Sequence, residues 1–234
     1  MKFFIRNKMM SNTRINKRLE IELAAEKLFA LKGFRATSIR DIARAADVNS
    51  SMISYYFRSK EQLLTAIFKR VLLSLNRVAF NLTGSHIEEI EKLFHLVDFY
   101  TGMILEHGRL VYIFLQEQML RSCPESVGLL GEFHSRQFIL FSEIIQEGIS
   151  NGKFREAISM PLVFANLLGT LRFIVIEHHG LTLSEDQVSR KIIQNMMRDA
   201  NSYLKSLLVM QLIPPACACN AETCLSFNIN THEI

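Results

Sequence analysis

Residues 33–68 read GFRATSIRDIARAADVNSSMISYYFRSKEQLLTAIF, and they contain signals for two short helices joined by a tight turn. Ser38 can cap a helix over residues 38–45, and Asp41 follows three residues later, as in a capping box. Asn49 can cap a second helix over residues 50–57. Helices this short are not stable alone in water, so both must pack against neighbours. The pattern predicts a helix-turn-helix.

Longer helices are expected on both sides of this pair. Residues 14–32 carry apolar side chains at steps of three and four, and Gly33 supplies a stop. On the other side, Ser59 and Gln62 form a capping pair at the start of a helix that continues to about residue 81. These two helices would brace the short ones.

The second short helix has an unusual outer face. Ile53, Tyr56 and Phe57 are the apolar positions that would face inward. A solvated helix usually carries Lys and Glu on its outside, but here the outer residues are short, polar or aromatic. This face is shaped to lie against another surface, and its side chains are Ser50, Ser51, Met52, Ser54 and Tyr55.

Charge is distributed unevenly along the chain. The net charge of the 234 residues is +4, yet residues 1–61 hold 13 Lys and Arg against 6 Asp and Glu. The remainder holds 14 basic against 17 acidic residues. This asymmetry indicates contact between the N-terminal quarter and nucleic acid or another anionic surface, with a merely solvated surface as the alternative.

Residues 14–71 resemble the DNA-binding domain of the TetR family of bacterial transcriptional regulators. The combination that carries the resemblance is Gly33-Phe34, Thr37-Ser38, Ile42-Ala43, Val48, Tyr56-Phe57 and Ser59-Lys60-Glu61. The family usually has Gly where this chain has Asp47, in the turn between the short helices. That position tends to need a positive φ, which Asp tolerates better than most residues.

The resemblance implies how the head would contact double-stranded DNA. The helix over residues 50–57 would enter the major groove, with Ser50, Ser51, Met52, Ser54 and Tyr55 facing the bases. The side chains implied for the phosphates are Thr37, Ser38, Arg40, Tyr56 and Lys60. Basic residues of an N-terminal arm would add attraction that does not depend on sequence.

The rest of the chain is also expected to be helical, which makes the fold class all-α with about nine helices. Further helices are predicted near residues 86–106, 109–121, 125–151, 160–178 and 185–209, with capping pairs Ser85–Glu88 and Ser184–Gln187. The predicted organisation is a flexible basic arm (1–13), the DNA-binding head (14–74), a helical effector-binding and dimerisation body (75–210) and a disordered tail (211–234).

Aromatic residues gather in the body, where a filled core alone accounts for most of them and an apolar cavity is the alternative. In the resembling family such helices enclose an effector pocket, so the resemblance implies an apolar or aromatic small-molecule effector. The candidate pocket residues are Phe94, Phe99, Tyr100, Met103, Phe114, Gln116, Phe133, His134, Gln137, Phe138, Phe141 and Asn166.

The last two long helices predict a homodimer. Residues 162–176 are apolar nearly all round, so the helix should be covered on two sides. The family pairs these helices with their copies, which would place two recognition helices on a palindromic operator. The candidate interface residues are Leu167, Leu171, Ile174, Ile192, Met196, Ala200 and Tyr203.

No catalytic signature, cofactor motif or metal-ligand spacing stands out, and no membrane span or secretory signal is expected. Three of the four cysteines, Cys217, Cys219 and Cys224, lie close to the C-terminus and fit no common zinc pattern. The expected function is therefore a cytoplasmic DNA-binding regulator, most naturally a repressor, and not an enzyme. The alternative is a helical small-molecule binding protein with a non-functional DNA head.

Overall fold

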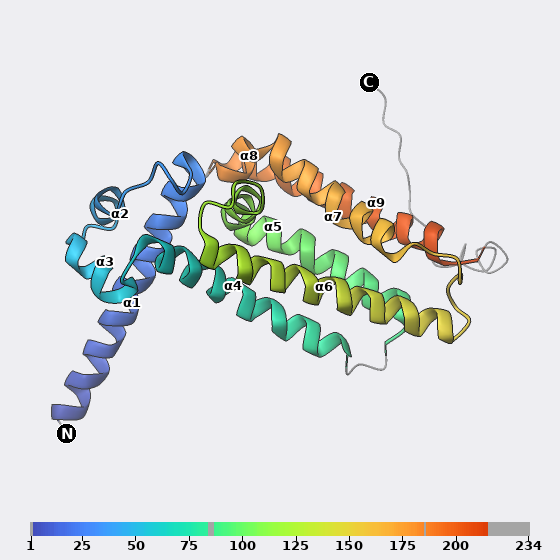
Figure 1. Ribbon diagram of the computed structural model, residues 1–234, viewed down its shortest axis with the longest axis horizontal. Coiled ribbons are helices and arrows are strands. Elements are labelled where there is room, and N and C mark those ends of the chain that lie inside the picture. Colours follow the sequence, from blue (N-terminus) through green and yellow to red (C-terminus); the bar gives the residue numbers. More distant parts are fainter. Residues whose placement is uncertain (1, 84–86, 185, 215–234) are drawn as a thin grey trace.

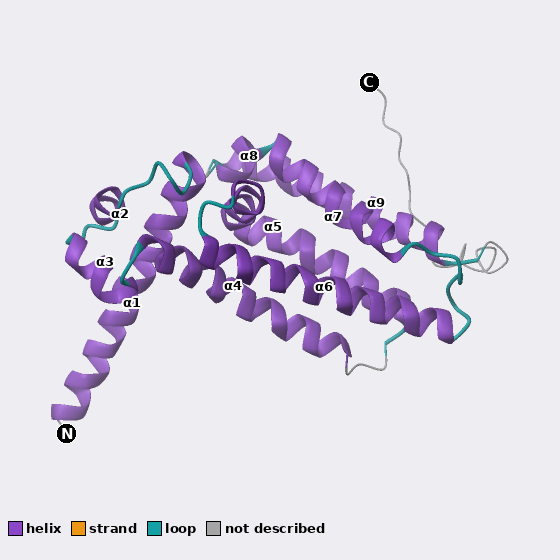
Figure 2. Cartoon of the chain, viewed as in Figure 1, coloured by secondary structure: helices purple, strands orange, loops and turns teal. Residues whose placement is uncertain are grey.

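The computed structural model describes residues 2–83, 87–184 and 186–214, with side chains described for 17–70, 72 and the later ranges. All regular structure in this part of the chain is helical (Figures 1 and 2), which confirms the all-α class. The helices are α1 (Lys2–Lys32), α2 (Ile39–Ala45), α3 (Ser50–Phe57), α4 (Lys60–Thr83), α5 (Glu89–Leu120), α6 (Pro124–Ser150), α7 (Met160–Glu177), α8 (His179–Leu183) and α9 (Gln187–Leu212).

The N-terminal head is formed by α1, α2, α3 and the first turns of α4. Its core takes one fully buried side chain from each of these helices: Phe29, Ile42, Ile53 and Leu64. Gly33 ends α1 with a φ of +83°, a conformation that glycine adopts without steric cost. Helices as short as α2 and α3 are not stable alone in water, so packing against this core stabilises them.

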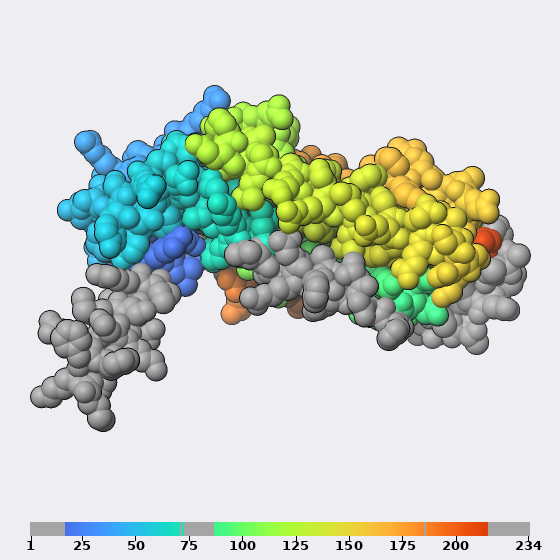
Figure 3. Space-filling view, turned by 60° about the horizontal axis from the view of Figure 1, so that its bottom comes forward, coloured from blue at the N-terminus to red at the C-terminus, as the bar shows by residue number. Residues whose placement is uncertain are grey.

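The body is a bundle in which α5 lies at the centre, with α6, α7 and α9 packed around it (Figure 1). Its core includes Val97, Phe141, Val175 and Leu212, which are fully buried. Along one long face, α6 extends from the head to the far end of the body (Figure 3).

Helix α4 connects the head to the body without a loop between them. Its Leu63 and Leu64 pack in the head, and the same apolar cluster continues to Leu110 on α5 and Leu130 on α6. Thr65 on α4 also lies 3.4 Å from the Ser126 hydroxyl of α6. Helix α4 therefore contacts both the helices of the head and the helices of the body.

Three helix boundaries differ from the sequence predictions. Helix α1 begins at Lys2 rather than near residue 14, because residues 2–13 contain neither Gly nor Pro to stop it. The helices expected at 86–106 and 109–121 form one helix, α5, with a kink at His107 (φ −130°, ψ 32°). Helix α8 was not expected, and its five residues lie within the segment predicted to be a connection.

Two of the predicted capping pairs are confirmed. Ser38 accepts a hydrogen bond from the Asp41 N–H, and the Asp41 carboxylate accepts one from the Ser38 N–H, both at 3.1 Å. The Ser59 hydroxyl accepts from the Gln62 N–H. The Ser184–Gln187 pair was wrong, because Asp186 caps α9 by accepting from the Ser189 N–H at 2.8 Å. Ser85 lies outside the described residues.

Helix α7 has an unusual surface. Among the described residues it is the one helix long and apolar enough to cross a membrane by composition, and 28% of its 18 residues are buried. Its exposed apolar side chains are Leu162, Phe173 and Ile176. Core helices of soluble proteins pass the same test of length and composition. The exposed side chains show that one apolar face of α7 is uncovered in this chain.

Candidate functional site

Helix α3 presents an open face on the head. Ile53 and Phe57 anchor the helix in the core, and the Asn49 side chain caps it by accepting from the Ser51 N–H at 3.1 Å. Of the five side chains expected to face the bases, Ser51, Ser54 and Tyr55 are exposed, and Ser50 and Met52 are half-buried. Tyr55 is 71% exposed, so a large aromatic side chain stands uncovered on this face.

The turn before α3 has the positive φ that the sequence predicts at Asp47. Asp47 has a φ of +49°, and the Val48 N–H donates to the Ala43 carbonyl at 3.0 Å across the turn. The turn after α3 was not anticipated. Arg58 has φ +64° and ψ −47°, and the Ser59 N–H donates to the Phe57 carbonyl at 2.7 Å, which makes a strained three-residue γ-turn.

Ser38 and Arg40 lie exposed at the start of α2, as a phosphate contact requires. The Ser38 hydroxyl donates to the Asp41 carboxylate at 2.6 Å, and hydrogen bonds from Ser38 hold the pKa of Asp41 below its ordinary value. Tyr56, also expected at a phosphate, is half-buried with its ring edge-on to the ring of Tyr55.

Thr37 corrects one prediction. Its side chain is 1% exposed, and its hydroxyl donates to the Gly33 carbonyl at 2.8 Å. The residue closes the loop between α1 and α2, so its hydroxyl faces the inside of the head rather than solvent. Burial excludes Thr37 as a phosphate donor in this conformation.

Lys60 makes contacts within the head that the sequence did not predict, and its expected phosphate contact stays a prediction. Its ammonium donates to the Phe34 carbonyl and to the Thr37 carbonyl, each at 2.9 Å, and lies 4.4 Å from the centre of the Phe34 ring. The side chain therefore braces the loop that leads into α2. These partners are 26 and 23 residues away in sequence, so no local spacing could have revealed them.

A network of charges joins α1 to α4 behind this surface, and sequence reasoning missed it. Arg70 pairs with Glu22 at 3.0 Å and with Glu26 at 3.3 Å, and Arg18 pairs with Glu22 at 3.3 Å. Burial raises the pKa of Glu26. The network links α1 to α4.

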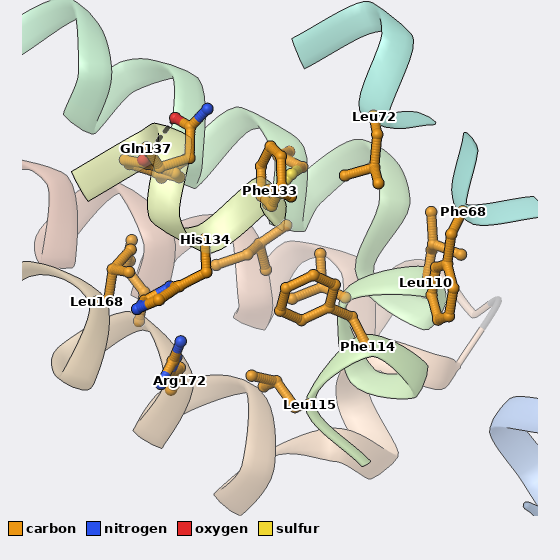
Figure 4. Close-up of a pocket in the computed structure, with 15 residues that line it drawn as sticks. Phe68, Leu72, Leu110, Phe114, Leu115, Phe133, His134, Gln137, Leu168 and Arg172 are labelled. Carbon is orange, nitrogen blue, oxygen red and sulfur yellow. Dashed lines mark hydrogen bonds between the residues drawn. The ribbon is translucent and has the colours of Figure 1, made fainter. Parts of the chain in front are cut away.

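The body contains a partly open cavity of about 80 Å³ that is almost wholly apolar. Six of the predicted pocket residues line it: Tyr100, Met103, Phe114, Phe133, His134 and Gln137. Figure 4 shows that the lining also includes Phe68 and Leu72 of α4. The same helix thus touches both the cavity and the head.

The other six predicted pocket residues do not line this cavity. Phe141 is fully buried in the core, Phe138 lines a separate groove beside α7, and Gln116 lines a groove near the head. Asn166 is exposed, and Phe94 and Phe99 are half-buried elsewhere on α5. Helices turn about 100° per residue, so composition alone could not show which aromatic side chains share one face.

Two polar features lie at the cavity. The Tyr100 hydroxyl donates to Gln137 Oε1 at 2.8 Å, and burial raises the pKa of Tyr100. His134 and Arg172 lie beside each other at the edge (Figure 4). Burial lowers the pKa of His134, and the positive charge of Arg172 lowers it further.

Some of the predicted dimer residues lie on the exposed faces of their helices, and others lie on the faces packed in the core. Ile192 and Tyr203 are exposed, and Ile174 and Met196 are half-buried. The other three are corrections, because their side chains lie in the core of their own chain: Leu167, Leu171 and Ala200. A helix that is apolar all round does not reveal in sequence which face is turned inward.

The remaining candidates concern metals and the tail. Among the described residues, no group of three or more His, Cys, Asp or Glu side chains could hold a metal ion. His178 caps the end of α7, and the His179 ring stacks on Tyr112. Cys217, Cys219 and Cys224 lie outside the described residues.

Known proteins resemble both parts of the chain. Residues 22–67 match the family model described as bacterial regulatory proteins, tetR family. The HTH-type transcriptional repressor KstR2 of Rhodococcus jostii is 30% identical over 155 residues, which span 66% of this chain and 76% of that protein. The probable HTH-type transcriptional regulator YttP of Bacillus subtilis is 31% identical over 146 residues, or 59% of this chain and 66% of its own length.

Solved structures show the same fold. The ketosteroid transcriptional regulator KstR2 of Mycobacterium tuberculosis superposes with a TM-score of 0.66 at 23% identity, covering 84% of this chain and 95% of that one. The transcriptional regulator FadR of Bacillus subtilis, solved in complex with stearoyl-CoA, has a TM-score of 0.59 at 19% identity, covering 79% of this chain and 97% of that one.

Proposed function

The chain belongs to the TetR family of bacterial regulatory proteins, and from this premise we propose that it represses transcription as a homodimer that a small molecule releases from a palindromic operator. Its relatives are transcriptional regulators rather than enzymes. The observation that carries the proposal is the exposed face of α3, whose opposite side is anchored in the head by Ile53 and Phe57. Since its target is chromosomal DNA, we place the protein in the cytoplasm.

In this proposal the exposed side chains of α3 read the bases. Ser51 and Ser54 can donate or accept hydrogen bonds, and Tyr55 presents both a hydroxyl and an apolar ring. Ser50 and Met52 are less exposed and complete the contact surface. Ser38, Arg40 and Tyr56 bind phosphates, whereas Lys60 and Thr37 hold the loop that positions α2.

The division of the chain follows from these roles. Residues 14–74 bind DNA, and residues 75–210 bind the effector and form the dimer. Basic residues in the N-terminal arm (1–13) add attraction to the phosphate backbone that depends on salt and not on sequence.

We place the dimer interface on the uncovered apolar faces of α7 and α9. Besides Ile192 and Tyr203, the exposed side chains include Leu162, Phe173, Val188 and Met210. A two-fold interface brings the same face of each chain together, so the two α3 helices are related by two-fold symmetry. An operator that matches such a dimer is an inverted repeat.

The effector site in this proposal is the apolar cavity of the body. Phe68 and Leu72 form part of its wall, and the earlier turns of the same helix, α4, hold the head through Leu63 and Leu64. A ligand that pushes on this wall shifts α4 and changes the separation of the two heads. DNA and ligand then prefer different states, so each weakens the binding of the other.

Fluorescence anisotropy with a labelled duplex from the DNA flanking the gene tests the function directly. We expect binding that weakens as salt rises, because phosphate contacts release counterions. A duplex of the same length and base composition with its sequence scrambled serves as the control. A folded dimer that binds neither the flanking DNA nor any other duplex in a salt-dependent way would contradict the proposal.

A further inference from the structure

Arg172 is a half-buried, positively charged side chain at a cavity whose lining is otherwise almost wholly apolar. Its guanidinium is half-buried at the edge of the cavity, and burial lowers its pKa. Other shielded cations of the body are paired: Lys92 lies 2.8 Å from Glu147, and Lys205 lies 2.6 Å from Asp98. For Arg172, the described part of the chain offers no carboxylate within ion-pair distance.

His134 adds a second donor at the same place. It projects from α6 next to Arg172, which projects from α7 (Figure 4). Because burial and the charge of Arg172 both disfavour protonation, the ring is held neutral and offers one N–H. The Tyr100 hydroxyl donates to Gln137 Oε1, so the donors of the lining that remain without a hydrogen bond in the described part of the chain are the Gln137 amide N–H groups, His134 and Arg172.

Arg172 lies where a ligand bound in the cavity could contact it. A groove between α6 and α7 adjoins the cavity, and His134, Leu168 and Arg172 line both of them. Arg172 therefore stands where the cavity opens towards the outside. A ligand whose apolar part fills the cavity would bring its other end to this residue.

We propose that the effector is an organic carboxylate, with its apolar body between Phe114, Phe133 and Leu171 and its carboxylate on Arg172, assisted by the N–H of His134. This inference rests on the proposed function, since it names the ligand of the effector site. A neutral apolar ligand would cover the guanidinium without pairing it, which is unfavourable, whereas a carboxylate pairs the charge as it buries it.

The size of the cavity limits the ligand. A volume of about 80 Å³ accommodates roughly five to eight water-sized groups. The apolar body that fits without further opening is therefore a short chain or a single ring. Saturated acids of six, eight and ten carbons cover this range and have alcohols of matching length without the charge.

The experiment compares hexanoate, octanoate and decanoate with 1-hexanol, 1-octanol and 1-decanol by isothermal titration calorimetry on the full chain. We expect the best acid to bind at least about tenfold more tightly than its alcohol. Arg172→Gln should weaken that acid by about ten- to hundredfold, the range for losing a hydrogen bond to a charged group, and leave the alcohol nearly unchanged.

Two further variants make the result specific. Arg136→Gln removes a positive charge from an exposed site on α6, the helix of His134, and should change neither affinity. Arg172→Lys keeps the charge and should retain a preference for the acid. Thermal melts of all variants establish that each is folded before its binding is compared.

The proposal is overturned if the alcohols bind as tightly as the acids, if Arg172→Gln keeps the full preference, or if none of the six compounds binds. DNA binding of the same preparation, measured by anisotropy, separates the two levels of the account. A chain that binds DNA but shows no acid preference refutes the ligand class alone. A chain that binds no DNA refutes the proposed function, whatever the compounds do.

Discussion

At the scale of single residues, the head separates side chains that hold its shape from side chains that are free to touch DNA. Thr37 and Lys60 are occupied by backbone carbonyls, whereas Ser51 and Tyr55 are exposed on α3. The sequence predicts the short helix α3 and its exposed face, because caps and apolar spacing are local. It does not predict the roles of Thr37 and Lys60, because their partners are brought to them by the fold.

Tyr55→Ala is expected to alter DNA sequence preference while leaving the fold intact. The side chain is 71% exposed, and replacing such residues usually changes the free energy of unfolding by less than about 0.5 kcal/mol. Losing a base contact costs about 1–3 kcal/mol at the base that it reads. Thermal denaturation and binding to a panel of single-base operator variants check the two parts, and an unchanged panel profile would exclude Tyr55 from base reading.

Lys60→Met should act on the fold and on all DNA sequences alike. The variant keeps the apolar stem but loses the hydrogen bonds to the carbonyls of Phe34 and Thr37. We expect this loss to lower the free energy of unfolding by about 1–3 kcal/mol. A chemical denaturation curve measures this loss. A variant that melts like the wild type yet binds DNA poorly would instead assign Lys60 to a phosphate.

The titration of His134 reports the charge at the cavity edge. Its pKa lies below the ordinary value through burial and the charge of Arg172, so Arg172→Gln should raise it part of the way back. The folded chain binds fewer protons here than the unfolded chain, so this group's contribution to the unfolding free energy rises with pH and is smallest in acid. Ring resonances followed by NMR check the pKa, and no upward change would contradict the contact with Arg172.

At the scale of helices, close packing depends on particular glycines. A Cβ on Gly148 of α6 would lie 2.2 Å from the Phe154 ring, whereas Gly131 on the same helix has open space around it. The sequence predicts α6 well, since Pro124 starts it and its apolar spacing is regular. It does not predict the uninterrupted course of α5, because Gly108, next to the kink at His107, favours a break between two helices.

Gly148→Ala should lower the free energy of unfolding by about 1–3 kcal/mol, because the Phe154 ring has to move. Gly131→Ala is the matched control and should be neutral or stabilising by up to about 1 kcal/mol, since alanine favours a helix. Urea denaturation of the two variants measures the contrast. Equal stabilities would show that Phe154 does not pack against α6 as described.

Arg58→Gly and Arg58→Ala test the strained turn between α3 and α4. Arg58 has a φ of +64°, which glycine adopts readily and alanine does not. The glycine variant should therefore be more stable than the alanine variant by about 1 kcal/mol, the usual size of such strain. The difference between their unfolding midpoints measures it, and a more stable alanine variant would rule out the turn.

At the scale of the whole molecule, the proposed function has α4 couple a ligand cavity to the DNA-binding head, and has α7 and α9 join two such molecules. The apolar composition of α7 predicts that it is covered on two sides. Which face meets the partner could not be predicted, and Leu167 and Leu171 prove to belong to the chain's own core. Only the packed body reveals that Phe173 and its neighbours remain uncovered.

Phe173→Glu should convert the dimer to a monomer and abolish operator binding. The side chain is 64% exposed on one chain, and a charge introduced there would lose its hydration in both copies of the proposed two-fold interface. Met119→Glu, at a site 77% exposed on α5, is the matched control and should leave the dimer intact. Sedimentation velocity measures the mass, and a dimeric Phe173→Glu variant would place the interface elsewhere.

The central claim is that two α3 helices of one dimer read one duplex, and selection of binding sites from random DNA tests it most directly. The account predicts an enriched inverted repeat, with half-site centres about 34–36 Å apart or at a multiple of that spacing. The Tyr55→Ala protein should select an altered repeat at matching positions in both halves. Enriched sites without two-fold symmetry, or no enrichment by a folded dimer, would contradict the account.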